Sequence, residues 1–317
     1  IFWHQPSFMS TLFESALSTA QAAAGSQHYP TGALYVVATP IGNLADISLR
    51  ALQVLNLCDT VACEDTRHSQ SLLRAYKIDK QNHQWLAVHQ HNEAEASQEV
   101  VRRLQAGQRV AYVSDAGTPA VSDPGARLVW QVQQAGLRVV PLPGASSITT
   151  LLSACGTPVP DSQGFVFVGF LSSKAGERTQ AVQGLANEAR TQVLLEAPHR
   201  IEALASALAQ LGNRPITLGR ELTKQFEDVV TLPANAFTEW LQADAQRKRG
   251  EFVLVIHARA ETSSATGDTP RILQLLLAEL PLKTAVKLAA DITGEARNDV
   301  YAMALALKKQ SDAPTPD

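Results

Sequence analysis

Segments rich in Gly, Pro and Ser follow three apolar runs in the first half of the chain, where they could form a ligand site. They are Thr39–Asn43 (TPIGN), Ser114–Pro119 (SDAGTP) and Pro141–Ser147 (PLPGASS). Gly and Pro let the backbone turn sharply and approach a ligand closely. Because open α/β sheets bind ligands at the carboxyl ends of their strands, the three segments predict one shared site. Taken singly, Thr39–Asn43 is also typical of an ordinary turn, and Asp115 of a turn-capping residue.

Two further segments carry groups that could transfer a proton or bind a charge. Glu64–Arg67 (EDTR) is either a cluster that faces substrate or a helix cap with an exposed ion pair. His89 and His91 resemble half of a metal site, but no third ligand follows at a diagnostic spacing. We therefore expect no metal.

Cations stand at the ends of two predicted strands in the second half of the chain. Arg200 ends the segment EAPHR, while Arg220 and Lys224 begin and end the segment RELTK. They could contact phosphates or form surface ion pairs. A basic run at 247–249 has no alternating aromatic residues, so the residues alone do not indicate an RNA-binding face.

The composition excludes several classes of protein. The 317 residues are 45% hydrophobic and 18% charged, as in a globular enzyme. No apolar run approaches the roughly 20 residues of a membrane span. The three cysteines form no CxxC pair, which favours a reducing cytoplasm over secretion. Neither GxGxxG nor a Walker A motif occurs, so ordinary dinucleotide and P-loop sites lose support. With 27 Lys plus Arg against 30 Asp plus Glu, any site for a polyanion must be local.

The elements that must position these groups begin near Leu34, where short β-branched runs alternate with amphipathic helices. This alternation predicts parallel βαβ units. The expected strands of this first α/β domain span residues 34–38, 60–62, 109–113 and 137–142. The expected helices run from 46 or 48 to 57, from 93 to 105, from Asp123–Pro124 to 136, and from 145 to 154. Asp123 can cap its helix, because its carboxylate can accept hydrogen bonds from the free backbone N–H groups of the first turn. Pro124 suits the first helical position because it has no backbone N–H that would need a partner.

A loss of periodicity at residues 156–164 predicts the boundary of a second α/β domain. Its expected strands are 165–168, 193–195, 216–218, 229–232 and 252–256, with helices at 178–189 and 200–211. A Ser/Thr/Gly linker at 261–269 precedes expected helices at 271–280, 282–292 and 296–309. The predicted parts are a flexible N-terminal extension (1–31), two α/β domains (32–156 and 157–262) and a helical C-terminal module (270–317). Met9 would make a natural start, with residues 1–8 then upstream of the natural protein.

Taken together and in order, these motifs closely resemble the bacterial ribosomal RNA small-subunit methyltransferase I family, the 16S rRNA (cytidine-2′-O)-methyltransferases. The resemblance extends from about Gly32 to Lys309 and includes Glu279–Lys283 (ELPLK). It implies a tetrapyrrole-methylase-like, class III methyltransferase fold, in which two α/β domains enclose a cleft and a small helical module follows.

The resemblance also implies the chemistry. The cofactor would be S-adenosylmethionine and the substrate the ribose of a cytidine in the decoding region of 16S rRNA, within the small ribosomal subunit. The enzyme would be a cytoplasmic homodimer that uses neither a metal nor a membrane. The residues carried over as cofactor contacts are Ile41, Asp115, Gly117, Thr118, Ser146, Ser147, Gly169, Phe170, Leu222, Gly250 and Glu251.

A ribose hydroxyl is a poor nucleophile until a positioned base accepts its proton. Glu64, Asp65 or His91 could be this base, and we favour Glu64 or His91. We expect four cations to align phosphates. Arg67 belongs to the candidate catalytic residues with Glu64 and His91, and the candidate RNA-binding residues are Arg200, Arg220 and Lys224.

Two other functions fit parts of the pattern. A precorrin- or uroporphyrinogen-type methylase of small tetrapyrroles would share the fold and the cofactor. Such enzymes usually carry a GxGPGD-like turn, however, where this chain has Thr39–Asn43. A non-catalytic ribosome-assembly module would keep the cofactor site without turnover.

Overall fold

The computed structural model describes residue 13 and residues 15–89, 91–122, 125–156, 164–259 and 265–311. The expected helix start at Asp123–Pro124 and the interpretation of residues 1–8 lie outside these ranges. The chain divides into two compact units, Ile1–Ala258 and Arg259–Asp317. Within the described ranges, no helix is both long and apolar enough to cross a membrane.

The first sheet is parallel throughout, and its five strands follow the order β3-β2-β4-β1-β5. The strands are β1 (Ala33–Val37), β2 (Thr60–Cys63), β3 (Trp85–Ala87), β4 (Val110–Val113) and β5 (Arg138–Leu142). The short edge strand β3 was not predicted, because three residues carry too little periodicity to detect. Since all five strands are parallel, the loops after β1, β4 and β5 leave the same edge of the sheet.

Helices cover both faces of this sheet. Alternate residues of β1 point to opposite faces: Tyr35 packs with α2, α3 and α4, whereas Leu34 packs with α5 and α6. These helices are α2 (Ala16–Ala24), α3 (Leu49–Leu57), α4 (Thr66–Ala75), α5 (Glu93–Gln105) and α6 (Gly125–Gln134). Burial on both faces explains why the strands read as continuous apolar runs rather than as alternating ones.

The described part of the N-terminal extension differs from the flexible segment that we expected for residues 1–31. Its helix α2 packs on α3, with Ala20 fully buried. Tyr29 is also buried, and its hydroxyl donates to the carbonyl of Ala24 at 2.9 Å. The small alanine side chains of α2 allow it to pack closely on α3. The sequence did not predict this contact because the hydrophobic periodicity of the segment is weak.

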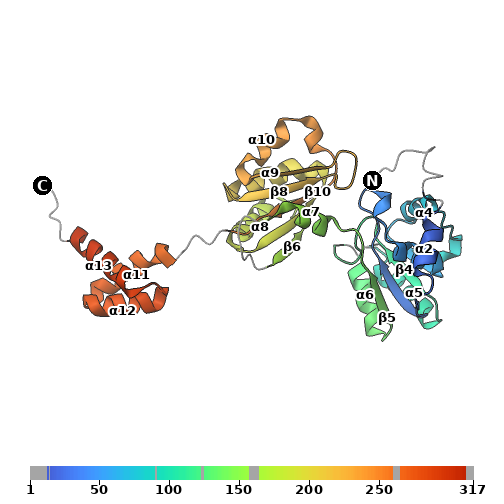
Figure 1. Cartoon of the computed structure of the whole chain (residues 1–317), viewed down its shortest axis with the longest axis horizontal. Helices are drawn as coiled ribbons and strands as arrows, with labels where there is room; N and C mark the ends of the chain where they lie inside the picture. The colour runs from blue at the N-terminus through green and yellow to red at the C-terminus, as the bar shows by residue number, and fades with distance from the viewer. Residues whose placement is uncertain are drawn as a thin grey trace. The chain divides into compact units, whose positions relative to one another are not determined.

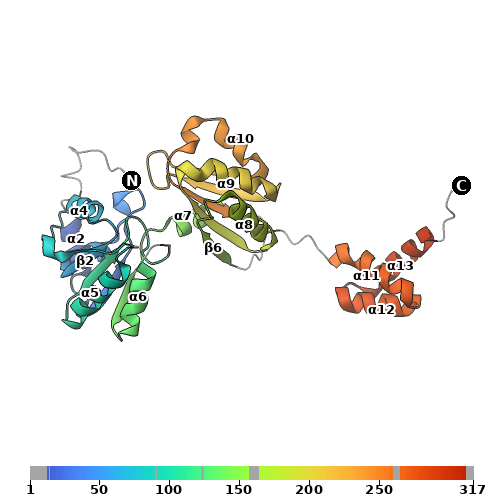
Figure 2. The ribbon, with the colours of Figure 1, turned by 180° about the vertical axis from the view of Figure 1, so that it is seen from behind.

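The second sheet is mixed, with the order β6-β7-β10-β8-β9. Only the pair β6–β7 is parallel, and the other neighbours are antiparallel. The strands are β6 (Phe165–Gly169), β7 (Thr191–Glu196), β8 (Pro215–Arg220), β9 (Asp228–Pro233) and β10 (Phe252–Ile256), close to the five that we predicted. Helices α8 (Ala175–Asn187), α9 (Ile201–Leu208) and α10 (Phe237–Gln242) cover one face (Figures 1 and 2).

The other face of the second sheet is covered by α7 (Ser147–Cys155), which follows β5 of the first sheet. Its Leu151 is fully buried against Val193, Val253 and Val255 of the second sheet. We expected this helix to belong to the first domain, with a boundary after residue 156. By packing, α7 belongs with the second sheet, because its apolar side chains find their partners there.

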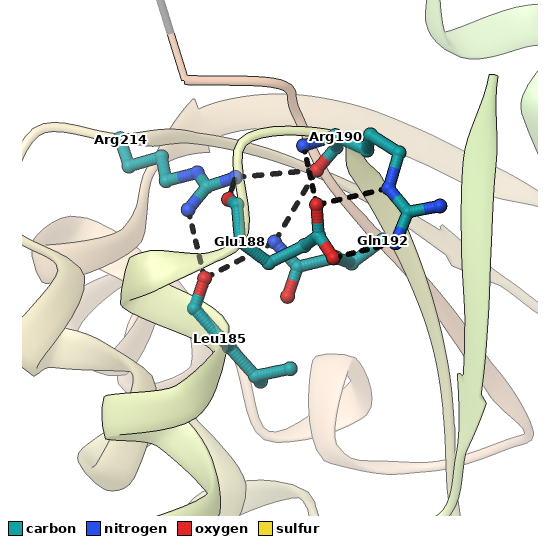
Figure 3. Close-up of polar contacts among 5 residues, drawn as sticks. All are labelled: Leu185, Glu188, Arg190, Gln192 and Arg214. Atoms are coloured by element: carbon teal, nitrogen blue, oxygen red, sulfur yellow. Dashed lines mark hydrogen bonds and ion pairs between the residues drawn. The ribbon is translucent and has the colours of Figure 1, made fainter. Parts of the chain in front are cut away.

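Arg214 fixes the turn between α8 and β7 (Figure 3). Its guanidinium donates to the carbonyls of Leu185 and Glu188, each at 3.0 Å, and to that of His257 at 2.8 Å. Gln192 donates to Leu185 as well, and Arg190 pairs with the Glu188 carboxylate at 2.8 Å. This turn lies at the amino end of β7. The network therefore stabilises the sheet and lies away from the carboxyl ends of the strands, where a ligand site is expected.

Short 3-10 helices and a C-terminal bundle complete the described structure. The 3-10 helices are Leu44–Asp46, Asn82–Gln84, Pro198–Arg200, Ala209–Leu211, Ala234–Ala236 and Ala245–Lys248. The second unit contains α11 (Ala265–Glu279), α12 (Leu282–Thr293) and α13 (Arg297–Ser311), as the sequence predicted within a few residues at most positions. Leu273, Ala289 and Val300, one from each helix, are fully buried in its core.

Candidate functional site

Direct contacts join the loops that leave the carboxyl edge of the first sheet. Thr39 and Gly117 exchange two backbone hydrogen bonds of 2.9 and 3.0 Å, which tie the loop after β1 to the loop after β4. The Thr118 hydroxyl donates to the carbonyl of Ala145 at 3.0 Å and ties in the loop after β5. Gly117 has a φ of +81°, a conformation that favours glycine. The three segments singled out by the sequence therefore form one surface.

The loop after β8 closes onto the loop after β1. The backbone N–H of Asn43 donates to the Thr223 hydroxyl at 3.1 Å. A Cβ atom added to Gly42 would lie 2.6 Å from that hydroxyl oxygen and 2.8 Å from the carbonyl oxygen of Leu222. Only a glycine permits this approach, so Gly42 lets the two sheets contribute to one site.

The loop after β8 is held in an unusual conformation by ionic contacts. Glu221 and Thr223 both have positive φ values, of 51° and 68°. The Glu221 carboxylate accepts from Lys224 Nζ at 2.7 Å and from the backbone N–H of Glu251 at 2.9 Å. Burial alone would raise the pKa of Glu221, but these hydrogen bonds and nearby cations keep it below its ordinary value. Burial acts in the opposite direction on Lys224, whose pKa is nevertheless raised by Glu221 and Glu251.

A cavity of about 340 Å³, the central cavity, lies where these loops meet. The first sheet and α7 contribute Ile41, Ala116 and Ser147 to its lining. The second sheet and its loops contribute Phe170, Leu195, Glu196, Ala197, Pro198, Leu222, Glu251, Phe252 and Val253. The lining is largely apolar with a few polar groups, as is usual for a small-molecule site.

Five of the residues expected to contact a cofactor line this cavity, namely Ile41, Ser147, Phe170, Leu222 and Glu251. The others adjoin those segments: Asp115, Gly117 and Thr118 in the loop after β4, Ser146 before α7, Gly169 at the end of β6, and Gly250 beside Glu221. Sequence reasoning missed the β7 end, 195–198, as part of the cavity. Its signal was the EAPHR segment, which we had interpreted through its cations alone.

The cations expected to bind RNA are engaged within the protein. Arg200 Nε lies 3.0 Å from the Glu196 carboxylate, whose side chain is only 1% exposed. Arg220 contacts the carbonyls of Gln246 and Arg249 and is 13% exposed. Lys224 is held between Glu221 and Glu251. Their primary contacts are thus structural, because buried or half-buried carboxylates lie beside each of them.

The three residues expected to act in catalysis lie after two neighbouring strands of the first sheet, Glu64 and Arg67 after β2 and His91 after β3. Glu64 directly follows β2 and is half-buried, whereas Arg67 is 89% exposed and pairs with Asp65 at 3.2 Å. His91 follows β3 and is exposed, with its ring 6.0 Å from that of His89. Burial raises the pKa of Cys63, next to Glu64, to about 12, so this thiol is not a nucleophile at neutral pH.

Sheet order distinguishes Glu64 from His91. Strand β2 is the direct neighbour of β4, while β3 lies one strand farther out. A second link joins the α4 region to the loop after β4, since His68 Nε2 lies 3.0 Å from the carbonyl oxygen of Asp115. Glu64 therefore lies on the strand end adjacent to the loop after β4.

The loop after β4 also has the features that a cofactor would require. Asp115 has one carboxylate oxygen buried without a hydrogen-bond partner among the described residues. A buried acceptor without a donor is costly, so this atom suits a donor on a bound molecule. The same residues contain no group of three or more His, Cys, Asp or Glu side chains placed to hold a metal ion.

Most of the chain matches known families. Residues 33–237 match the family Tetrapyrrole (Corrin/Porphyrin) Methylases, and residues 263–308 match the RsmI C-terminal HTH domain. The chain is 46% identical over 279 residues to ribosomal RNA small subunit methyltransferase I of Pseudomonas aeruginosa, covering 86% of this chain and 97% of that protein. It is 44% identical over 277 residues to the protein of the same name from Escherichia coli O157:H7, covering 86% and 95%.

Solved structures share the fold at much lower identity. A cobalt precorrin-4 methyltransferase aligns with a TM-score of 0.52 and 17% identity, over 72% of this chain and 98% of that one. A uroporphyrin-III-C-methyltransferase from Thermus thermophilus aligns with a TM-score of 0.50 and 20% identity, over 71% and 94%. These neighbours confirm the tetrapyrrole-methylase-like fold that the resemblance implied.

Proposed function

Because the chain belongs to the ribosomal RNA small subunit methyltransferase I family, we propose that it methylates the ribose 2′-hydroxyl of a cytidine in the decoding region of 16S rRNA. The methyl donor of the family is S-adenosylmethionine. The proposed setting is the small ribosomal subunit in the cytoplasm, with the enzyme acting as a homodimer.

The observation that carries the proposal is the central cavity, lined from both sheets by residues of the expected cofactor set. Ile41, Leu222 and Phe170 would contact the apolar parts of the cofactor, and Asp115 would accept from one of its donors. Bound S-adenosylmethionine supplies a methyl group on a sulfonium, which is already an activated electrophile. The residues of the chain must then exclude water, orient the ribose and accept one proton.

Glu64 is the better of the two candidate bases. Its strand end adjoins the loop that carries Asp115, whereas His91 follows the edge strand β3. A half-buried carboxylate can accept a proton from a hydroxyl held at hydrogen-bond distance. We therefore propose Glu64 as the general base that accepts the proton of the 2′-hydroxyl, with His91 as the alternative.

The first experiment incubates the full-length protein with labelled S-adenosylmethionine and either unmodified small ribosomal subunits or free 16S rRNA. Mapping of 2′-O-methyl groups should find one cytidine in the decoding region. Labelled rRNA with the methyl group on a base or on another nucleotide would contradict the finer assignment. Label in a tetrapyrrole and none in RNA would instead favour the small-molecule reaction, and cofactor binding without any transfer would favour an assembly module.

The base is tested with Glu64→Gln and His91→Gln in the same assay. We expect Glu64→Gln to lower the single-turnover rate by about 100-fold, within the range of general-base catalysis, and to leave cofactor affinity unchanged. Glu95→Gln, at an exposed position in the first turn of α5, is the matched control. A large loss with His91→Gln and none with Glu64→Gln would reverse the assignment.

A further inference from the structure

The N-terminal segment builds a second cavity at the opposite end of the first sheet from the central cavity. Thr31 precedes β1 and Arg109 precedes β4, so this cavity lies at the amino ends of those strands. Its volume is about 430 Å³. We call it the N-terminal cavity, and it is lined by Gly25, Gln27, His28, Tyr29, Pro30, Thr31, Gln53, Leu57 and Arg109.

Most of this lining lies outside the part of the chain that matches the tetrapyrrole methylases. The match begins at residue 33, whereas six of the lining residues fall between Gly25 and Thr31. The segment is nevertheless firmly attached, because α2 packs on α3 and Tyr29 is buried. The N-terminal cavity is therefore an ordered feature that the methylase fold itself does not require.

Two polar side chains in the lining lack partners for most of their hydrogen-bonding groups. Arg109 Nε donates to the carbonyl of Tyr29 at 3.1 Å, while its two terminal nitrogens contact no acceptor among the described residues. Gln53 is only 8% exposed, and its Oε1 is buried with no partner in the same part of the chain. The buried Gln53 oxygen costs free energy when it is left unpaired, and the terminal nitrogens of Arg109 can still donate, so the two side chains together indicate a ligand that pairs with both.

The charge around the cavity selects the class of ligand. The lining includes Arg109 and His28 but no Asp or Glu. Arg50 lies one helical turn from Gln53 on α3, and its Nε is likewise buried without a partner among the described residues. Asp59 approaches Arg109 only through the backbone, since its carboxylate accepts the Arg109 N–H at 2.7 Å. A positive, polar cavity with a planar guanidinium is suited to a phosphate.

We propose that the N-terminal cavity binds a phosphate group through Arg109, with Gln53 contacting the same ligand. The phosphate belongs either to a phosphodiester of RNA or to a free nucleotide. The first source rests on the proposed function, because it would make the cavity a second contact with rRNA remote from the reacting ribose. The second source would make it an independent nucleotide site.

The test measures binding to the full-length protein by calorimetry with three probes. They are inorganic phosphate, adenosine monophosphate and a short single-stranded oligoribonucleotide without terminal phosphates. We expect Arg109→Gln to weaken binding of the responsive probe by about tenfold or more, since a charge-assisted pair is lost. Arg127→Gln is the matched control, because Arg127 is a 66% exposed residue that pairs with Glu93 on the surface.

A second variant protects the test against a folding defect. Arg109 holds the Tyr29 carbonyl, so Arg109→Gln could loosen the segment. Gln53→Met keeps the side-chain length and removes an amide oxygen that has no partner among the described residues, so the protein should melt at an unchanged or higher temperature. We expect this variant to weaken the same probe by several-fold.

The outcomes separate the two sources and the two proposals. If Arg109→Gln and Gln53→Met weaken the binding of phosphate and the mononucleotide alone, the cavity is a nucleotide site. If they weaken the binding of the oligoribonucleotide, the cavity is an RNA contact. The proposal is overturned if the wild-type protein binds none of the probes, or if Arg109→Gln and Gln53→Met bind them as Arg127→Gln does. None of these readouts needs methyl transfer, so failure of the proposed function would be seen separately in the rRNA assay.

Discussion

The loops of the first sheet and those of the second sheet contribute to the central cavity in different ways. The first sheet presents its loops through backbone contacts, such as the two hydrogen bonds between Thr39 and Gly117. The second sheet presents its loops through charged side chains, such as Glu196 with Arg200 and Glu221 with Lys224.

This difference follows from the topology of the two sheets. Parallel strands end at one edge, so neighbouring loops there can meet through their own backbones. In the mixed sheet, β7 and β8 both run antiparallel to their shared neighbour β10, which begins at the edge where they end. Where β10 begins, the Glu221 carboxylate of the loop after β8 accepts from the backbone N–H of Glu251, so a charged side chain joins these two segments. Motifs that look like ligand-binding cations can therefore be structural supports.

The largest expected effect comes from removing a structural cation of the second sheet. Arg200→Met should lower the free energy of unfolding by about 3 kcal/mol, because it leaves the buried Glu196 carboxylate without its ionic partner. Urea denaturation measures this loss. Lys174→Met is the control, since Lys174 is exposed and its pair with Glu177 lies at the surface. An unfolding free energy equal to that of the wild type, with impaired rRNA binding, would restore Arg200 as an RNA contact.

A substitution in the loop after β1 should weaken ligand binding as well as stability. Gly42→Val would push against Leu222 and Thr223 of the facing loop, and overpacking of this kind costs about 1–3 kcal/mol. We expect S-adenosylmethionine to bind about tenfold more weakly, as measured by calorimetry. Gly176→Ala adds a methyl group where nothing lies within 4 Å and should bind the cofactor normally. Equal affinity in the two variants would show that the loops do not need this contact.

Acid should weaken the second sheet before the first. His257 is 2% exposed, and its Nε2 lies 2.7 Å from the Thr217 hydroxyl. Burial, aided by Arg214, lowers the pKa of His257 from the ordinary 6.5, so the unfolded chain binds a proton more readily than the folded one. The contribution of neutral His257 to stability is therefore present above pH 6.5 and is lost as the pH falls toward its lower folded value.

Hydrogen exchange as a function of pH measures this effect separately in each sheet. The amides of β8 and β10 should lose protection as the pH falls below 6.5, and those of β1 and β4 should change less. His257→Gln should remove the difference. Parallel loss of protection in both sheets of the wild-type protein would contradict the assignment to His257.

The smallest effect is expected at Arg67, an exposed cation in the first turn of α4. Its pair with Asp65 is open to solvent, so Arg67→Gln should leave the melting temperature unchanged. If Arg67 contacts an rRNA phosphate, the variant should reduce the slope of log affinity against log salt by about one. Arg74→Gln, on the same helix, provides the comparison. An unchanged slope would remove Arg67 from the RNA-binding surface.

Much of the fold could be predicted from local patterns. Each strand of the second sheet carries a β-branched or apolar run, and each was expected within a few residues of its observed position. Strand β3 and helices α4 and α10 were not predicted. Strand β3 and helix α10 are short and weakly periodic, whereas the segment of α4 had been interpreted only through its first charged residues. Packing relations escaped for a different reason: the assignment of α7 to the second sheet depends on which apolar surface Leu151 meets, and that surface is formed by strands far along the chain.

The candidate site shows the same division. Turn chemistry identified the loops after β1, β4 and β5, because Gly and Pro mark sharp turns wherever they occur. The roles of Arg200, Arg220 and Lys224 could not be inferred locally, since a cation is equally suited to a phosphate and to a carboxylate. Their partners include Glu196, Glu251 and the carbonyls of Gln246 and Arg249, which only the folded chain brings to them.

The sequence by itself determined the family, the two α/β domains and the lining segments of the central cavity other than the β7 end, because motifs, strand periodicity and turn-forming residues are read over short stretches of chain. Only the tertiary structure decided that Gly42 meets the loop after β8, that α2 is packed rather than loose, and that Arg109 and Gln53 line one cavity. These features depend on distances between residues far apart in the chain, and such distances are set by the packing of the whole fold.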